Sequence, residues 1–112
     1  MQSLGMLNET QRIEMGRSFA ERLMREGKDD NDRLNRMFNL LACRNPTDAE
    51  RTACTNLLER MRTRYTETPA DAQALLGIGD TPRNEQLDPA ATAAWAQVAL
   101  TVLASDVALL LY

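Results

Sequence analysis

Two cysteines, Cys43 and Cys54, carry the most reactive side chains of this sequence, and it contains no histidine. The residue type that most often binds metals or acts as a general base near neutral pH is therefore absent. Cys43 precedes the turn at Asn45-Pro46 and Cys54 follows it by about two helical turns, an offset too large for a disulfide across a helix hairpin. We predict two buried, free thiols, because a two-thiolate metal site would need ligands from another chain.

Two further patterns are typical of ligand sites but have simpler interpretations. The acidic run Asp29-Asp30-Asn31-Asp32 lacks the mid-loop glycine and terminal glutamate of a calcium-binding EF-hand loop, so we interpret it as a helix cap. Gly77 and Gly79 follow no predicted strand and accompany no lysine-containing phosphate loop, so we predict a helix C-cap and a turn. We predict no catalytic residue, no metal site, no cofactor and no enzymatic activity.

Asp106 is the most informative polar residue, because it is the only charged residue between Ala90 and Tyr112. Helical spacing places it on one face with four apolar residues, namely Trp95, Ala99, Val102 and Leu109. A buried carboxylate needs a partner, and the candidates are Arg36 and Arg44. We predict a structural ion pair or cap; the alternative is a functional carboxylate in a pocket.

Helices must position these residues, because alanine, leucine, methionine, arginine and glutamate dominate and no long segment alternates apolar and polar residues. Asn8 with Gln11, and Thr47 with Glu50, form capping boxes at two helix starts. Prolines after Thr68 and Asp88, and the acidic run, mark three more starts. We predict helices over residues 9–26, 30–43, 48–66, 69–76 and 89–111, with the second and third antiparallel neighbours across their short loop.

The last predicted helix, residues 89–111, is the most apolar and contains no basic residue. A membrane span is the alternative to a buried helix, but Gln97, Thr101 and Asp106 would then lie inside the bilayer. We therefore predict an all-α fold: one domain over residues 1–112, a small bundle of four main helices plus a short one, with the apolar C-terminal helix at its centre. Five of the six methionines are predicted mainly as core residues, with an adaptable binding groove as the alternative.

Charge and composition narrow the possible partners. The net charge is −3, and acidic and basic residues are interleaved, which disfavours nucleic-acid binding. Hydrophobic residues make up 44% of the chain, which is typical of a folded domain. The N-terminal residues do not form a signal peptide. We predict no membrane span and no small-molecule ligand.

Several stretches, in order, resemble a known family. These are Leu4-Gly5-Met6-Leu7-Asn8, Ala20-Glu21-Arg22-Leu23, Asp32 to Leu40, Cys43 to Glu50, Gly79-Asp80-Thr81-Pro82, Leu87-Asp88-Pro89-Ala90 and Ala94-Trp95. Together they are similar to a C-terminal domain of unknown function in large planctomycete proteins. The sequence departs from that pattern at Cys43, where the family usually has glycine, and at residues 104–108, which replace its usual ending.

The resemblance implies where the domain occurs in a longer protein, and it implies no catalytic residue. Related domains end long proteins that look exported and that often carry cytochrome c-like modules, so an exported or periplasmic location and a C-terminal fragment of a longer protein are expected. The chain has no haem-attaching C-x-x-C-H motif of its own. We predict a non-enzymatic structural or interaction module that docks on upstream domains of its own chain or on another protein. The alternative is a contribution to an active or redox site shared with upstream domains.

Overall fold

The chain folds into five α-helices. The computed structural model describes residues 8–79 and 84–110, with side chains as far as Ala104. The helices are α1 (Glu9–Glu26), α2 (Asp30–Ala42), α3 (Asp48–Glu67), α4 (Pro69–Leu76) and α5 (Pro89–Leu110). No strand occurs in the described residues, so the all-α prediction is confirmed, and the helix limits differ from those predicted by at most a single residue.

The helix starts follow from local chemistry. Asn8 accepts a hydrogen bond of 2.7 Å from the Gln11 N–H, and the Gln11 side chain accepts one from the Asn8 N–H, which completes a capping box. Thr47 and Glu50 form the same reciprocal pair at the start of α3. Proline occupies the first position of α4 and α5, where a missing N–H costs nothing.

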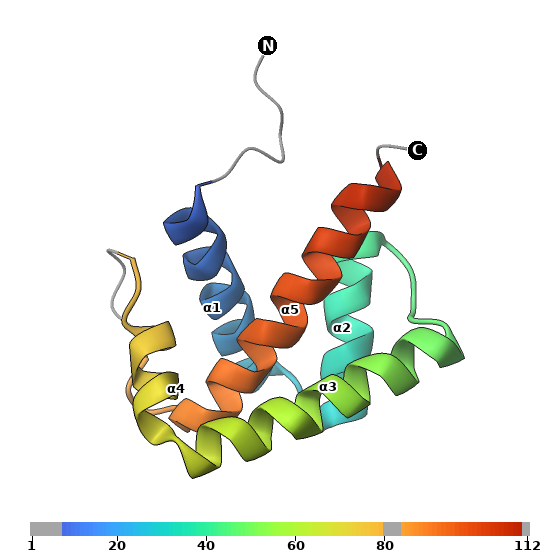
Figure 1. The fold of residues 1–112 in the computed structure, drawn as a ribbon. Coiled ribbons are helices and arrows are strands. Elements are labelled where there is room, and N and C mark those ends of the chain that lie inside the picture. Colours follow the sequence, from blue (N-terminus) through green and yellow to red (C-terminus); the bar gives the residue numbers. More distant parts are fainter. Residues whose placement is uncertain (1–7, 80–83, 111–112) are drawn as a thin grey trace.

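Helix α5 is the centre of the bundle, as predicted. It packs against each of the other four helices, and Figure 1 shows it running diagonally between α1 and α2 and across α3. Its middle turns are fully buried, and they supply the small and medium side chains at the centre of the core, namely Ala93, Ala94, Trp95, Ala96, Val98 and Ala99. This burial explains why the helix is apolar around most of its circumference.

Close packing between α1 and α5 depends on Gly16. A methyl group at this position would lie 2.7 Å from Cγ of Leu100 and 3.3 Å from the main-chain oxygen of Ala96. The absence of a side chain therefore lets the two helix backbones approach closely. In the described part of the chain, no helix has both the length and the apolarity that a membrane crossing requires.

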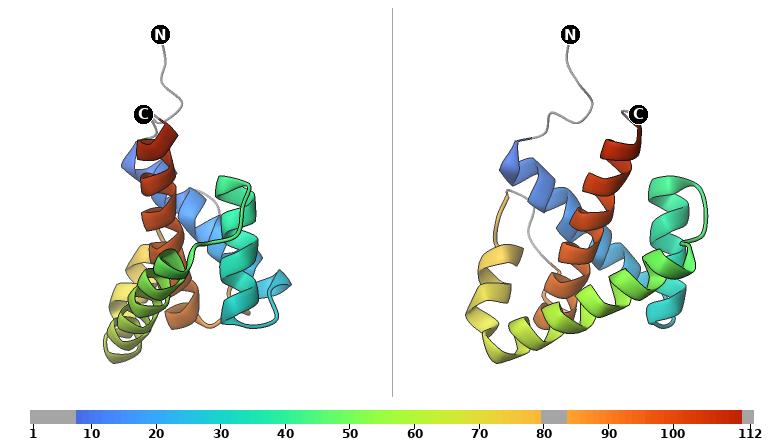
Figure 2. Two further views of the ribbon diagram at one scale, coloured as in Figure 1. Left: turned by 90° about the vertical axis from the view of Figure 1, so that its right-hand side faces the viewer. Right: turned by 45° about the vertical axis from the view of Figure 1, so that its right-hand side comes forward.

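The predicted antiparallel packing of α2 and α3 is wrong. In the views of Figures 1 and 2, α3 crosses the lower part of α2 steeply, and α3 packs along α5 and α4 instead. The five residues from Cys43 to Thr47 are the physical reason. An extended segment of this length reaches roughly 16 Å, enough to bring the start of α3 back down beside the middle of α2.

Candidate functional site

The arginines proposed as partners of Asp106 have partners of their own. Nε of Arg36 lies 2.9 Å from Oδ2 of Asp32, and Arg36 also approaches Glu26 at 3.9 Å. Arg44 donates two hydrogen bonds, of 2.7 and 2.9 Å, to the carboxylate of Glu50. The side chain of Asp106 lies outside the described residues, so its pairing with Arg36 or Arg44 stays a prediction.

Trp95 is a core residue, as its place on the predicted apolar face indicated. Its side chain is fully buried, and its ring lies in the main hydrophobic cluster with Ala99 and Val102. The Nε1–H group has no hydrogen-bond partner in the structure. A buried, unpaired indole N–H weakens the core slightly, so Trp95 contributes through its apolar surface.

The two thiols differ in environment, and only one matches the prediction. Cys54 is free and buried, and burial raises the pKa of its thiol, with a smaller contribution from the nearby Glu50 carboxylate. Cys43 is also free, but it is exposed, which corrects the prediction of a second buried thiol. It ends α2 with a φ of 59°, in the left-handed region that favours glycine. This conformation turns its side chain away from the core.

The acidic run caps α2, as we interpreted it. Asp29 accepts the Asp32 N–H at 2.8 Å, and Asp32 accepts the Lys28 N–H at 2.9 Å. The hydrogen bond from Lys28, followed by that from Arg36, lowers the pKa of Asp32. In the described part of the chain no group of three or more cysteine, aspartate or glutamate side chains is arranged to hold a metal ion.

Polar side chains form direct links between α2 and α3. Asp30 receives two hydrogen bonds of 2.7 Å from Arg62, and these bonds lower the pKa of Asp30 and raise that of Arg62. Arg51 donates to Asn31 and, at 2.9 Å, to Asn35. These links span the steep crossing, where long side chains can reach between helices that do not pack along their lengths.

A fully buried arginine, Arg17, was missed by the sequence analysis. Only 1% of its side chain is exposed, and its Nη1 donates a 2.9 Å hydrogen bond to the main-chain oxygen of Leu76 at the end of α4. Nη2 lies 4.0 Å from the Glu14 carboxylate, and neither Nε nor Nη2 has a hydrogen-bond partner. The spacing of the residues could have indicated this burial. Arg17 follows Ile13 by four residues and precedes Ala20 by three, which places it on the apolar stripe of α1.

Gly77 and Gly79 form the helix C-cap and turn that were predicted. The Gly77 N–H donates to the Gln73 oxygen at 3.0 Å and closes α4. Gly79 has a φ of +99°, and a methyl group there would lie 2.6 Å from the Glu14 carboxylate carbon. The backbone conformation therefore requires the second glycine, whereas the flexible Glu14 side chain could move aside.

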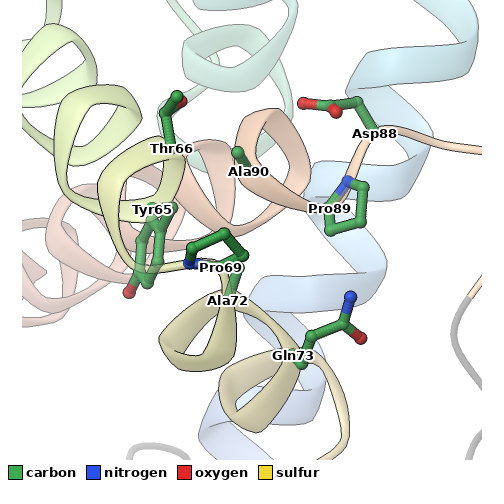
Figure 3. Close-up of a pocket in the computed structure, with 8 residues that line it drawn as sticks. All are labelled: Tyr65, Thr66, Pro69, Ala72, Gln73, Asp88, Pro89 and Ala90. Carbon is green, nitrogen blue, oxygen red and sulfur yellow. The ribbon is translucent and has the colours of Figure 1, made fainter.

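A surface hollow lies where α3 ends and α4 and α5 begin. Eight residues line about 250 Å³ of space, namely Tyr65, Thr66, Pro69, Ala72, Gln73, Asp88, Pro89 and Ala90. Figure 3 shows the two proline rings and the two alanines among its lining residues, together with Thr66 and Asp88. The acids with lowered pKa values, Asp30, Asp32 and Glu50, lie elsewhere, in the ion pairs of α2 and α3.

The last turns of α5 lie far along the helix from the hollow, at the end of the bundle where α2 also ends. In Figures 1 and 2 these turns rise beyond the end of α2. After the buried Val102, Leu103 is half-buried and Ala104 is exposed, and the helix continues to Leu110 through a segment whose only charged residue is Asp106. Near the end of α2, Leu40 leaves 44% of its surface exposed.

Four of the methionines lie in the described part of the predicted helices. Met37 is fully buried, and Met24 and Met61 are partly buried and pack against the core. Met15 is half-buried, and Met6 lies outside the described residues. Core packing therefore accounts for at least three of these side chains.

Comparison with known proteins gives one result. A family model described as PSD1, a protein of unknown function (DUF1553), matches residues 1–58. The match covers α1, α2 and the first half of α3, and therefore includes the stretches from Leu4 to Glu50 that carried the resemblance in the sequence. No curated protein and no solved structure matches the chain.

Proposed function

The chain belongs to the PSD1 family of proteins of unknown function, and we propose that it is a non-enzymatic docking module that binds another polypeptide through the C-terminal end of α5. One observation carries the proposal: α5 continues as a helix to Leu110, eight residues past Val102, which is the last buried residue among the side chains that the structure describes, and six of these eight residues are apolar. A largely apolar helical segment at the end of a bundle is typical of an interaction site.

The position of the extension supports docking. Val107, Ala108, Leu109 and Leu110 follow Asp106 without another charge. The half-exposed Leu40 at the neighbouring end of α2 adds apolar surface at the same end of the bundle. Burying apolar surface contributes about 25 cal/mol per Å², so an interface of a few hundred square ångströms here supplies a useful part of the association energy.

The proposed partner is a domain of a longer parent chain, or a separate protein. The resemblance to planctomycete C-terminal domains favours the first, with this chain closing a large exported protein. An active site shared with upstream domains receives less support. The acids with lowered pKa values are held in ion pairs with arginines on α2 and α3, and they do not converge on the hollow.

Calorimetric titration of this chain with the rest of its parent polypeptide tests the proposal. We expect a Kd in the micromolar range or tighter, with a negative heat-capacity change from apolar burial. Leu109→Asp should weaken binding at least tenfold. Ala53→Asp, which introduces the same charge at an exposed position of α3, is the matched control and should bind normally. Absence of binding, or equal loss from both variants, would contradict the proposal.

A further inference from the structure

The hollow between α3, α4 and α5 carries an inference that is independent of the α5 end. Part of its lining is apolar, namely the rings of Pro69 and Pro89 and the methyl groups of Ala72 and Ala90 (Figure 3). Its volume of about 250 Å³ is below the roughly 300 Å³ at which ligand pockets for drug-sized molecules begin. A single long side chain of a partner fits this space better than a larger ligand does.

The lining of the hollow, as far as the structure describes it, includes one carboxylate, that of Asp88, and no basic side chain. Arg64 stacks on the ring of the lining residue Tyr65 at 5.1 Å and is paired with Asp71 at 3.5 Å. The Asp88 carboxylate favours a cationic group over a neutral or anionic one.

Helix N-termini often bind anions, but the two that meet here offer few donors. Both helices begin with proline, Pro69 and Pro89, which has no N–H. In α5 the Ala91 N–H is bound by Oδ2 of Asp88 at 2.9 Å, and the Thr92 N–H by the Asp88 main-chain oxygen at 3.0 Å. The carboxylate therefore already occupies the place that an anion would take.

The capping hydrogen bond leaves the Asp88 carboxylate able to bind a cation. Oδ2 of Asp88 accepts the Ala91 N–H, and a carboxylate can accept further hydrogen bonds at both oxygens. The aliphatic stem of a long basic side chain matches the apolar part of the lining.

We propose that this hollow is a receptor for a long basic side chain, such as that of lysine, presented by a partner polypeptide. The aliphatic stem lies on Pro69, Pro89 and Ala90, and the ammonium group donates to Asp88, with the Thr66 hydroxyl and the Gln73 amide as further polar contacts at the rim.

NMR titration of the ¹⁵N-labelled chain tests this site with two short probes, acetyl-Ala-Lys-Ala-amide and the same peptide with norleucine in place of lysine. The lysine peptide should shift the amide signals of Ala72, Gln73, Ala90 and Ala91. The norleucine peptide, which keeps the stem without the charge, should bind about three- to fivefold more weakly. Equal binding of the two peptides, or shifts confined to other residues, would overturn the proposal.

Two variants separate the site from general acidity. Asp88→Asn removes the charge and keeps the cap, because asparagine is an equally good N-cap residue, and it should lower lysine-peptide affinity to that of the norleucine peptide. Glu85→Gln removes the same charge from an exposed residue that does not line the hollow and should leave affinity unchanged. Equal effects of both variants would contradict a specific site.

Discussion

The buried guanidinium of Arg17 donates a 2.9 Å hydrogen bond to the main-chain oxygen of Leu76 and thereby ties α1 to the end of α4. Positive charge near a helix C-terminus is favourable, and the bond satisfies a carbonyl that the helix leaves unpaired. The remaining donors, Nε and Nη2, are buried without hydrogen bonds, which costs free energy. Arg17 therefore links two helices through one hydrogen bond, while two of its buried N–H groups lack acceptors.

Substitution of Arg17 separates these two contributions. Arg17→Met keeps most of the volume and removes the buried charge, so the free energy of unfolding should change by less than about 1 kcal/mol. Arg17→Ala leaves a cavity and should cost about 2–4 kcal/mol. Urea denaturation measures both. A loss from Arg17→Met as large as that from Arg17→Ala would show that the charge and its hydrogen bond stabilise the fold.

The left-handed conformation of Cys43 makes a second prediction. Cys43→Gly should raise the free energy of unfolding by about 0.5–1 kcal/mol, because glycine adopts a φ of 59° without steric cost. Cys43→Ala also removes the exposed thiol but keeps the strain, so it is the control and should have little effect. Thermal unfolding of the three proteins decides the matter, and equal stability of the glycine and alanine variants would contradict it.

Stability at acid pH should depend on Glu50. Hydrogen bonds from Arg44, and then from the Thr47 N–H, lower its pKa from an ordinary 4.5 to about 2. Because the folded pKa is depressed, this contribution is present above about pH 4.5 and is lost as the pH falls toward 2. Solvent screening limits it to about 1 kcal/mol, since both side chains are partly exposed.

Glu50→Gln isolates this contribution, because glutamine can complete the capping box without the charge. Its stability should fall less steeply than that of the parent protein between pH 4.5 and 2, as followed by urea denaturation at each pH. Parallel pH profiles for the two proteins would assign the acid sensitivity to other carboxylates, such as Asp30.

The close approach of α1 and α5 predicts an unfavourable Gly16→Ala substitution. Alanine improves helix propensity by about 1 kcal/mol, but its methyl group would lie 2.7 Å from Cγ of Leu100. Overpacking of this kind costs typically 1–3 kcal/mol, so we expect a net loss of about 1 kcal/mol. In a Leu100→Ala background only the 3.3 Å approach to the Ala96 oxygen remains, so Gly16→Ala should cost less there than in the parent protein. A double-mutant cycle without coupling between the two sites would contradict the close contact.

Local signals in the sequence predict most of this fold. Asn8 and Thr47 fix two helix starts through capping boxes, and Pro69 and Pro89 fix two more, because each acts within a few residues of its own position. The central place of α5 follows from its apolar circumference. The crossing of α2 and α3 could not be obtained in this way, since the direction of the connection from Cys43 to Thr47 depends on what α3 packs against.

The functional features depend on tertiary structure to different degrees. Arg17 lies on the apolar stripe of α1. Because arginine is almost never fully buried, its residue type alone predicts an exposed side chain. The hollow at Asp88 joins two segments, residues 65–73 and 88–90, that are fifteen positions apart at their nearest, and no local pattern brings them together. The apolar end of α5, in contrast, is visible in the sequence itself, although its extension beyond the core is not.

Hydrogen exchange of α5 in the presence of the parent polypeptide is the most direct test of the docking proposal. The account predicts that amide exchange from Leu103 to Leu110 slows when the partner is added, while exchange in the exposed turns of α3 stays unchanged, because the partner covers the end of α5. Exchange at Leu103 to Leu110 that is the same with and without a saturating partner would contradict the assignment of this surface as the docking site.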